Sequence, residues 1–122
     1  MEHNIKRGDI FYVDFGITVG SVQGRLRPVV ILQNDTGNKH SPTLIVATIT
    51  SKSNKKRELP THIVFNMDGL TKESIVQLEQ ITTIDKQQLI NYVGKMPQSA
   101  IWVAVPLSVH IKRVRSWMLT TH

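Results

Sequence analysis

Short apolar runs recur along most of the chain, and several of them alternate with the two-residue period of a β-strand. In residues 9–15, Ile10 and Tyr12 face one way while Phe11 and Val13 face the other. This run is also rich in aromatic and β-branched side chains, which favour strands. Comparable runs predict further strands at residues 27–33, 43–50, 62–66, 74–84 and 91–96.

Turn-forming residues separate these runs. Asn, Asp, Gly, Ser and Pro cluster in residues 34–42, 51–60 and 66–69. Short strands at this spacing, without a long helix between them, favour an antiparallel barrel or sandwich over a parallel sheet. We therefore predict a mainly β fold in which residues 1–96 form a small β-barrel. Asp85 is expected to cap one short helical turn.

The last quarter of the chain has helical character. Pro97 suits the first turn of a helix, and the apolar residues after it can continue that helix. Pro106 has no backbone N–H and clashes with the preceding turn, which costs about 3 kcal/mol in a helix interior. We therefore expect the helix to kink or end near Val105, giving a broken helical tail. Residues 97–122 are predicted to form this divergent segment of a single 122-residue domain.

The balance of charges points to a polyanionic partner. Fifteen Lys and Arg against nine Asp and Glu give a formal net charge of +6, which favours nucleic acid or an acidic polypeptide. The absence of cysteine excludes disulfides, thiolate metal sites and cysteine nucleophiles. No run reaches the roughly 20 apolar residues of a membrane-spanning helix, and the N-terminus lacks the apolar core of a signal peptide. A cytoplasmic location without a membrane partner is expected.

The histidines were considered as acid–base or metal-binding groups. The five histidines show no metal-ligand spacing. His62 is interpreted as structural. No metal ion or other cofactor is expected.

Five segments, taken in order, resemble the MazF/PemK family of bacterial toxin endoribonucleases. They are KRGDIFYVDF, GSVQGRLRPVVILQND, GNKHSPTLIVATIT, LPTHIVF and LEQITTIDK, spread over residues 6–86. The resemblance fades after about Asn91. It implies an SH3-like, MazF-like β-barrel with a terminal helix, working as a homodimer. It also implies metal-independent cleavage of single-stranded RNA at a short sequence motif, and a cognate antitoxin whose acidic or mixed apolar and acidic tail covers the RNA site.

The resemblance places Arg27 and Thr50 on the family's catalytic arginine and threonine. In the expected reaction the substrate's 2′-hydroxyl attacks the adjacent phosphate, leaving a 2′,3′-cyclic phosphate and a 5′-hydroxyl. A guanidinium suits the phosphate because it stays charged and donates several hydrogen bonds. Pro28 restricts Arg27 to extended geometry, while Gly20 and Gly24 let the preceding loop turn. The Thr50 hydroxyl can bond the phosphate or the departing oxygen.

A second group of residues is expected to bind RNA around this pair: Ser21, Gln23, Arg25, Lys52, Lys55, Lys56 and Gln80. Gln80 matches a polar position that lines the family's RNA groove. The lysines follow Thr50 closely and can hold phosphates beside the cut, which adds salt dependence more than sequence choice. Sequence choice is expected from unstacked bases whose edges meet polar side chains.

Two positions depart from the family pattern. Val22 replaces an acidic residue that is a candidate general base, and losing such a base typically slows a reaction about 10²- to 10⁴-fold. Thr82 stands where the family usually carries arginine. These departures leave open a non-catalytic module of the same fold that inhibits a protein target such as a topoisomerase, or that acts only with its antitoxin. A duplex-DNA binder ranks last, because the sequence shows no recognition helix.

Overall fold

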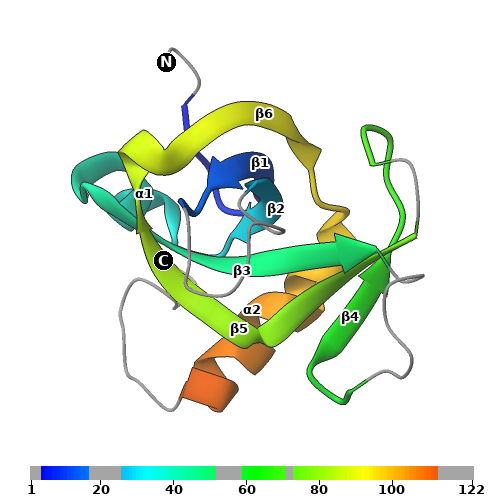
Figure 1. The fold of residues 1–122 in the computed structure, drawn as a ribbon. Coiled ribbons are helices and arrows are strands. Elements are labelled where there is room, and N and C mark those ends of the chain that lie inside the picture. Colours follow the sequence, from blue (N-terminus) through cyan, green and yellow to red (C-terminus); the bar gives the residue numbers. More distant parts are fainter. Residues whose placement is uncertain (1–3, 17–25, 52–58, 71–72, 113–122) are drawn as a thin grey trace.

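The computed structural model describes residues 4–16, 26–51, 59–70 and 73–112, with side chains as far as Val109. Six strands form one antiparallel sheet in the order β4-β5-β3-β2-β1-β6, and helix α2 packs against β4 and β5 (Figure 1). The strands are β1 (Asp9–Asp14), β2 (Leu26–Ile31), β3 (Thr43–Ser51), β4 (His62–Phe65), β5 (Ser74–Asp85) and β6 (Leu89–Lys95). The helices are α1 (Asp35–His40), the 3-10 turn η2 (Lys86–Gln88) and α2 (Gln98–Lys112).

The mainly β class predicted from the alternation is confirmed, and every predicted strand is present with small shifts at its ends. The sheet is strongly curved (Figure 1), but within the described segments its edge strands β4 and β6 do not pair with each other. The sheet is therefore not closed into a complete barrel. Asp85 caps η2 as predicted, because its side chain accepts a hydrogen bond from the backbone N of Gln87 at 2.8 Å.

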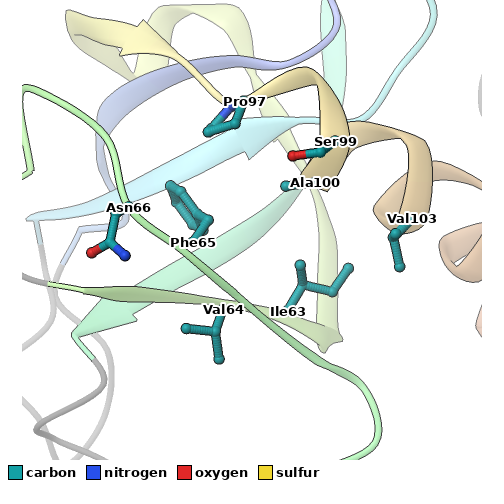
Figure 2. Close-up of a pocket in the computed structure, with 8 residues that line it drawn as sticks. All are labelled: Ile63, Val64, Phe65, Asn66, Pro97, Ser99, Ala100 and Val103. Atoms are coloured by element: carbon teal, nitrogen blue, oxygen red, sulfur yellow. The ribbon is translucent and has the colours of Figure 1, made fainter.

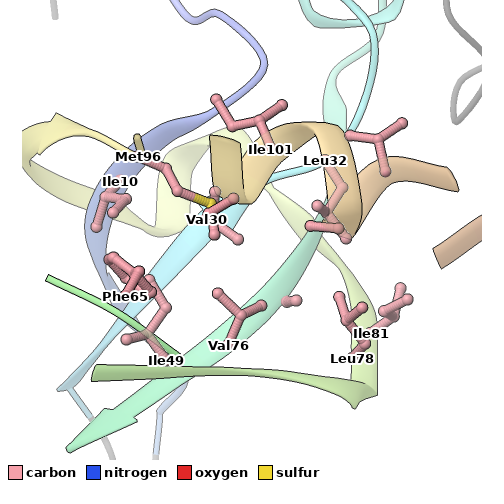
Figure 3. Packing of buried hydrophobic residues seen from close by; sticks show 14 residues of the cluster. Ile10, Val30, Leu32, Ile49, Phe65, Val76, Leu78, Ile81, Met96 and Ile101 are labelled. Atoms are coloured by element: carbon pink, nitrogen blue, oxygen red, sulfur yellow. The ribbon is translucent and has the colours of Figure 1, made fainter. Parts of the chain in front are cut away.

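The two faces of the sheet bury separate apolar clusters. On the face covered by α2, here called the helix face, Ile10 and Val30 pack with Ile101 of the helix (Figure 3). On the opposite face, Phe11 and Val29 belong to a second cluster. The alternation along β1 and β2 thus sends neighbouring side chains into different clusters. Residues at odd and even positions of these strands have different surroundings.

Helix α1 lies where the sequence pattern predicted only turns, so that prediction is wrong. Its N-cap is Asn34, whose side-chain oxygen accepts a hydrogen bond from the backbone N of Gly37 at 2.8 Å. The side chain of the buried Asn38 donates to the carbonyl of Gln33 at 2.9 Å. The helix has no apolar stripe, since its buried residues are Gly37 and Asn38. Polar contacts hold it in place, and a search for apolar periodicity does not detect them.

Helix α2 continues through Pro106, so the prediction of a helix broken near Val105 is wrong. The N–H that proline lacks would have bonded the carbonyl of Trp102, four residues earlier. Trp102 is 72% exposed and Pro106 is exposed too, so water can satisfy that carbonyl. On the buried side, Ala104 and Ser108 are fully covered, and this packing offsets the cost of the proline. None of the helices in the described segments has both the length and the apolar character needed to cross a membrane.

Candidate functional site

Arg27 and Thr50 lie on neighbouring strands of the sheet. Val29 of β2 pairs with Thr48 of β3, and this is the last paired position of the two strands toward Arg27 and Thr50, which each lie two residues beyond it. Both side chains are on the face opposite α2, because each is two residues from a side chain of that face. The two predicted site residues thus lie on the same face of neighbouring strands.

The local sequence explains how Arg27 reaches this position. Pro28 is the third residue of β2, where it pairs with Tyr12 of β1. Proline is tolerated in a strand where its missing N–H is not required, and β2 pairs with β3 only from Val29 onward. Arg27 has the extended backbone that a following proline imposes.

Neither of these two side chains is buried or engaged elsewhere in the described part of the chain. Arg27 and Thr50 are both half-buried. Within those segments, no ion pair or hydrogen bond involves the guanidinium of Arg27 or the hydroxyl of Thr50. The described residues therefore show no salt bridge for Arg27. A cation and a hydroxyl side by side can bind one phosphate group.

A bulge in β5 brings Gln80 to the same face. Ala47 of β3 pairs with Ile81, whereas the next residue of β3, Thr48, pairs with Gln77. The three residues of β5 between these pairs form the bulge. Gln80 lies in it, exposed, with its Oε1 atom 3.2 Å from the Thr48 hydroxyl. The predicted groove residue Gln80 thus contacts Thr48, which is two positions along β3 from Thr50.

Gln77 is a polar residue of this face that the sequence analysis did not single out. It is 0% exposed, and its Oε1 atom lies 3.0 Å from the Thr48 hydroxyl. Among the described residues, its Nε2 atom has no hydrogen-bond partner. A glutamine between the core residues Val76 and Leu78 was a detectable signal, because a polar residue amid a buried apolar run requires a partner.

His62, Glu79 and Thr61 form a second polar group next to the bulge. The imidazole Nδ1 of His62 accepts a hydrogen bond from the backbone N of Leu59 at 3.1 Å. Its Nε2 atom therefore carries the ring proton and donates to Glu79 at 2.9 Å. The Thr61 hydroxyl donates to the other carboxylate oxygen at 2.8 Å. His62 is thus structural in part, as interpreted, while Glu79 and Thr61 were missed.

The surroundings of Glu79 favour its ionised form. Burial raises the pKa of Glu79, but hydrogen bonds from Thr61, from its own backbone N–H and from His62 outweigh burial and hold the pKa below its ordinary value. The side chain of His62 is only 2% exposed, whereas that of Glu79 is 29% exposed. A fixed carboxylate therefore faces solvent beside the bulge. The described residues contain no group of His, Asp or Glu side chains arranged to hold a metal ion.

Six predicted RNA-binding residues lie outside the described residues: Ser21, Gln23, Arg25, Lys52, Lys55 and Lys56. Val22, at which the family's acidic residue is missing, lies outside them as well. The chain before β2 and the chain after β3 nevertheless join the sheet at the end where Arg27 and Thr50 stand. Thr82 is described, exposed, and paired with Val46.

An apolar groove of about 370 Å³ lies elsewhere, between β4 and the start of α2 (Figure 2). Its lining is Ile63, Val64, Phe65, Asn66, Pro97, Ser99, Ala100 and Val103. No charged side chain lines it, and strands β5 and β3 separate it from Arg27. This groove has no group suited to a phosphate.

The fold is that of the MazF-like toxins. An endoribonuclease from mycobacterial species, solved in complex with its cognate antitoxin, superposes with a TM-score of 0.71, 19% identity, and coverage of 92% of this chain and 98% of that one. MazF from Deinococcus radiodurans superposes with a TM-score of 0.74 at 14% identity, covering 93% and 100% of the two chains. At these identities the likeness establishes the fold alone.

Sequence comparison identifies the family. Residues 6–113 match the model described as PemK-like, MazF-like toxin of type II toxin-antitoxin system. Endoribonuclease MazF of Staphylococcus saprophyticus is 42% identical over 117 residues, which cover 92% of this chain and 97% of the relative. Endoribonuclease EndoA of Bacillus subtilis is 47% identical over 91 residues, covering 73% and 78%. The chain belongs to the PemK-like, MazF-like toxin family. The match continues past Asn91, where the resemblance was expected to fade.

Proposed function

We propose that this protein is the toxin of a toxin–antitoxin pair and cleaves single-stranded RNA as an endoribonuclease. Family membership and the names of the two curated relatives support the activity class. What supports the proposal in this chain is that Arg27 and Thr50 lie on one face of neighbouring strands, each two residues beyond the Val29–Thr48 pair, without a competing partner among the described residues. This is the minimum arrangement that phosphate activation requires.

In the proposed reaction the nucleophile comes from the substrate. The 2′-oxygen attacks the adjacent phosphorus, the bond from phosphorus to the 5′-oxygen breaks, and a 2′,3′-cyclic phosphate and a 5′-hydroxyl remain. Arg27 stabilises the extra negative charge on the phosphate, because its guanidinium stays charged and donates two parallel hydrogen bonds. The Thr50 hydroxyl donates a hydrogen bond to a phosphate oxygen or to the departing 5′-oxygen, and the 5′-oxygen takes its proton from water. No metal ion has a role in this scheme.

The proton of the 2′-hydroxyl needs an acceptor. Val22 cannot provide one, and Glu79 of β5 and His62 of β4 are bonded to each other, with strand β3 between them and Arg27 of β2. We therefore assign the proton to substrate-bound water. Without a positioned base, the rate is expected to be about 10²- to 10⁴-fold below that of a relative with an acidic residue at this position.

The proposal includes a cognate antitoxin and a second copy of the chain. Structural neighbours have been solved as an endoribonuclease with its cognate antitoxin and as MazE–MazF complexes. The net charge of +6 suits an antitoxin tail with acidic and apolar residues that competes with RNA. The protein is further proposed to be a homodimer in the cytoplasm, where messenger RNA is available.

The test is cleavage of a mixed-sequence single-stranded RNA in excess EDTA, with sequencing of the 5′-hydroxyl ends. Wild type is expected to cut, and Arg27→Ala and Thr50→Ala to lose cutting. Lys39→Ala and Thr83→Ala are matched controls, since both side chains are exposed on other parts of the surface. Thermal unfolding of all four variants checks that they fold. Absence of cutting by wild type at low salt would favour the non-catalytic module that inhibits a protein target.

A further inference from the structure

We propose that the outer face of α2 and the apolar groove beside it bind an amphipathic helix of the cognate antitoxin, on the side of the sheet away from Arg27 and Thr50. This inference rests on the proposed toxin–antitoxin pair and assigns to it a second contact surface. We call it the anchor surface. It consists of the exposed α2 residues Trp102, Val103 and Pro106 and the groove residues Ile63, Phe65 and Ala100.

The outer face of α2 carries no charge. The residues at positions 98, 99, 102, 103 and 106 are exposed, and their three- and four-residue spacing places them on one face of the helix. Between Gln98 and Val109 the sequence contains no Lys, Arg, His, Asp or Glu. A surface helix ordinarily presents charged and polar side chains to water, whereas a helix that is apolar all round is ordinarily covered. Trp102 is 72% exposed and Val103 is 53% exposed, which indicates a partner for this face.

The groove continues this uncharged face toward β4. Val103 of α2 and Ile63 of β4 both line the groove (Figure 2). Trp102, the neighbour of Val103 in the helix, protrudes into solvent. An exposed ring next to an apolar groove of about 370 Å³ suits an amphipathic helix, because such a helix lays its side chains at positions i, i+3, i+4 and i+7 into a groove.

The size of the anchor surface fits one helix better than a second copy of this chain. Residues 98–106 advance about 12 Å along the helix axis, and a helix with its side chains is about 10 Å wide. A stable pair of proteins buries about 800 Å² on each partner. This is several times the area of the helix face, even with the groove added. A homodimer held only here would therefore be weak, whereas about two turns of one helix cover the surface.

The charge of the chain favours an acidic partner for this surface. The net charge of +6 attracts a polypeptide of opposite sign. The anchor surface is itself uncharged, so a helix can bury an apolar stripe there without removing a charge of this chain from water. An antitoxin helix with an apolar stripe and an acidic outer side meets both conditions.

The anchor surface and the Arg27 site lie on opposite faces of the sheet. Val103 and Ile101 belong to the helix that covers one face, whereas Arg27 is on the face opposite that helix. An antitoxin that occupies both surfaces converts its second contact into an intramolecular step, which raises the overall affinity above that of either contact alone. The anchor surface therefore strengthens the binding of the tail that competes with RNA, without touching the RNA site.

A lipid bilayer is a poorer occupant than a helix. Helices that lie in a membrane surface carry Lys and Arg on their polar side, and residues 98–109 contain neither. The groove between β4 and α2 is also concave, so it receives inserted side chains better than it rests on a flat surface.

The experiment measures the Kd of the full-length protein for the full-length antitoxin encoded with it, by isothermal titration calorimetry. Trp102→Ser removes an apolar contact without changing the net charge and should weaken binding about 10-fold, as for a central tryptophan of an interface. The double variant Trp102→Ser/Val103→Ser should weaken it further. Ile90→Ser is the matched control, because Ile90 is 50% exposed on β6 outside the anchor surface, and its Kd should stay within about twofold of wild type.

Thermal unfolding of the three variants checks that each is folded. A folded double variant whose Kd is within about twofold of wild type would overturn the inference, because the loss would be no larger than at an ordinary surface position. Absence of antitoxin binding by wild type would overturn it as well.

A spectroscopic readout locates the contact on the molecule. The sequence contains two tryptophans, Trp102 and Trp117, so 5-fluorotryptophan in the Trp117→Phe protein labels Trp102 alone. Its ¹⁹F resonance should shift when the antitoxin is added and should stay unchanged when single-stranded RNA is added. A resonance that does not respond to the antitoxin would refute the anchor surface.

Failure of the inference can be told from failure of the proposed function, because RNA cleavage by the free protein is measured separately. If wild type does not cleave RNA but binds the antitoxin through Trp102, the proposed cleavage fails and the anchor surface stands. Sedimentation of the free protein and flotation with phosphatidylcholine–phosphatidylglycerol vesicles test the other occupants. Self-association or vesicle binding that Trp102→Ser abolishes would assign the surface to a second copy or to a bilayer, and would overturn the inference.

Discussion

The side chains of Thr48 and Gln77 meet across β3 and β5, with the hydroxyl of Thr48 3.0 Å from the Oε1 atom of Gln77. This contact lies two residues along β3 from Thr50, at the point where the β5 bulge begins. It places a buried amide beneath a surface that otherwise carries a cation, hydroxyls and a carboxylate. The Thr48 hydroxyl therefore links this buried amide to the exposed Gln80, on the face that carries the proposed catalytic pair.

Arg27→Lys is expected to be nearly as inactive as Arg27→Ala. Lysine keeps the charge but lacks the planar fork that holds two phosphate oxygens at once. Removing one preorganised donor of a developing oxyanion typically costs about 10²- to 10³-fold in rate. Single-turnover cleavage of a defined RNA would measure the loss, with Lys39→Arg as control. Activity of Arg27→Lys within a few fold of wild type would show that charge alone is sufficient.

Gln77→Leu is expected to stabilise the protein. Leucine has nearly the same volume and removes the unpartnered Nε2 atom, while Thr48 keeps Gln80 as a partner. A buried unsatisfied group costs about 1 to 3 kcal/mol, so the free energy of unfolding should rise by about 1 kcal/mol. Urea unfolding measures it. The control is Gln80→Leu at an exposed position, where the change should stay within about 0.5 kcal/mol. A less stable Gln77→Leu protein would contradict this account of the amide.

The pKa of Glu79 predicts a specific pH dependence of stability. Because its pKa is lower in the folded than in the unfolded protein, Glu79 stabilises the fold above its ordinary pKa of 4.5, and this contribution disappears as the pH falls through the lower folded value. The difference in unfolding free energy between wild type and Glu79→Gln should therefore be larger at pH 7 than at pH 3. Urea unfolding of both proteins across this range tests the sign. A difference that grows on acidification would contradict the hydrogen bonds assigned to the carboxylate.

Two glycines with positive φ provide a matched pair for testing the packing of α2. Gly8 has a φ of 90°, and a Cβ atom there would overlap the Cδ1 atom of Ile101. Gly16 has a φ of 74°, and a Cβ atom there would meet no atom of the described residues within 4 Å. Alanine at either position costs about 1 to 2 kcal/mol for the left-handed backbone. Gly8→Ala should cost about 1 to 3 kcal/mol more, from overpacking. Equal losses on thermal unfolding would show that Ile101 moves aside freely.

Pro106→Ala is expected to stabilise α2. Alanine restores the N–H that can bond the carbonyl of Trp102 and removes the clash with the preceding turn. Because the helix already accommodates the proline, the gain should be about 1 to 2 kcal/mol, below the full difference in helix propensity. Ala104, buried on the neighbouring turn, should keep its packing. Urea unfolding measures the gain. A loss of stability would indicate that the fixed backbone of proline is required at this point.

The strands could be predicted because their side chains alternate between the two apolar clusters. Val29 belongs to one cluster and Val30 to the other. Helix α1 could not, since it depends on the side chains of Asn34 and Asn38 and not on an apolar stripe. The path of α2 through Pro106 depends on packing between distant segments, which overrides local preference.

The residues of the candidate site also divide into those that could be predicted from the sequence and those that could not. Arg27 and Thr50 were singled out only through the resemblance of short sequence segments to the family; Arg27 is the second residue of β2, and Thr50 is the second-last residue of β3. Glu79 and Gln77 gained significance only through the bulge, which brings β5 residues to β4 and β3 partners far away in the sequence. Periodicity along one strand does not reveal a bulge, because a bulge is defined by how that strand pairs with the neighbouring strand.

The shortness of β4 has a consequence for the behaviour of the protein at high concentration. An edge strand offers unpaired backbone groups to other chains and is a starting point for aggregation. β4 has only four residues, and its first side chain is already bonded to β5 through Glu79. A foreign strand would find few positions to pair with on this side. Variants that lengthen β4 or release His62 should therefore be less soluble.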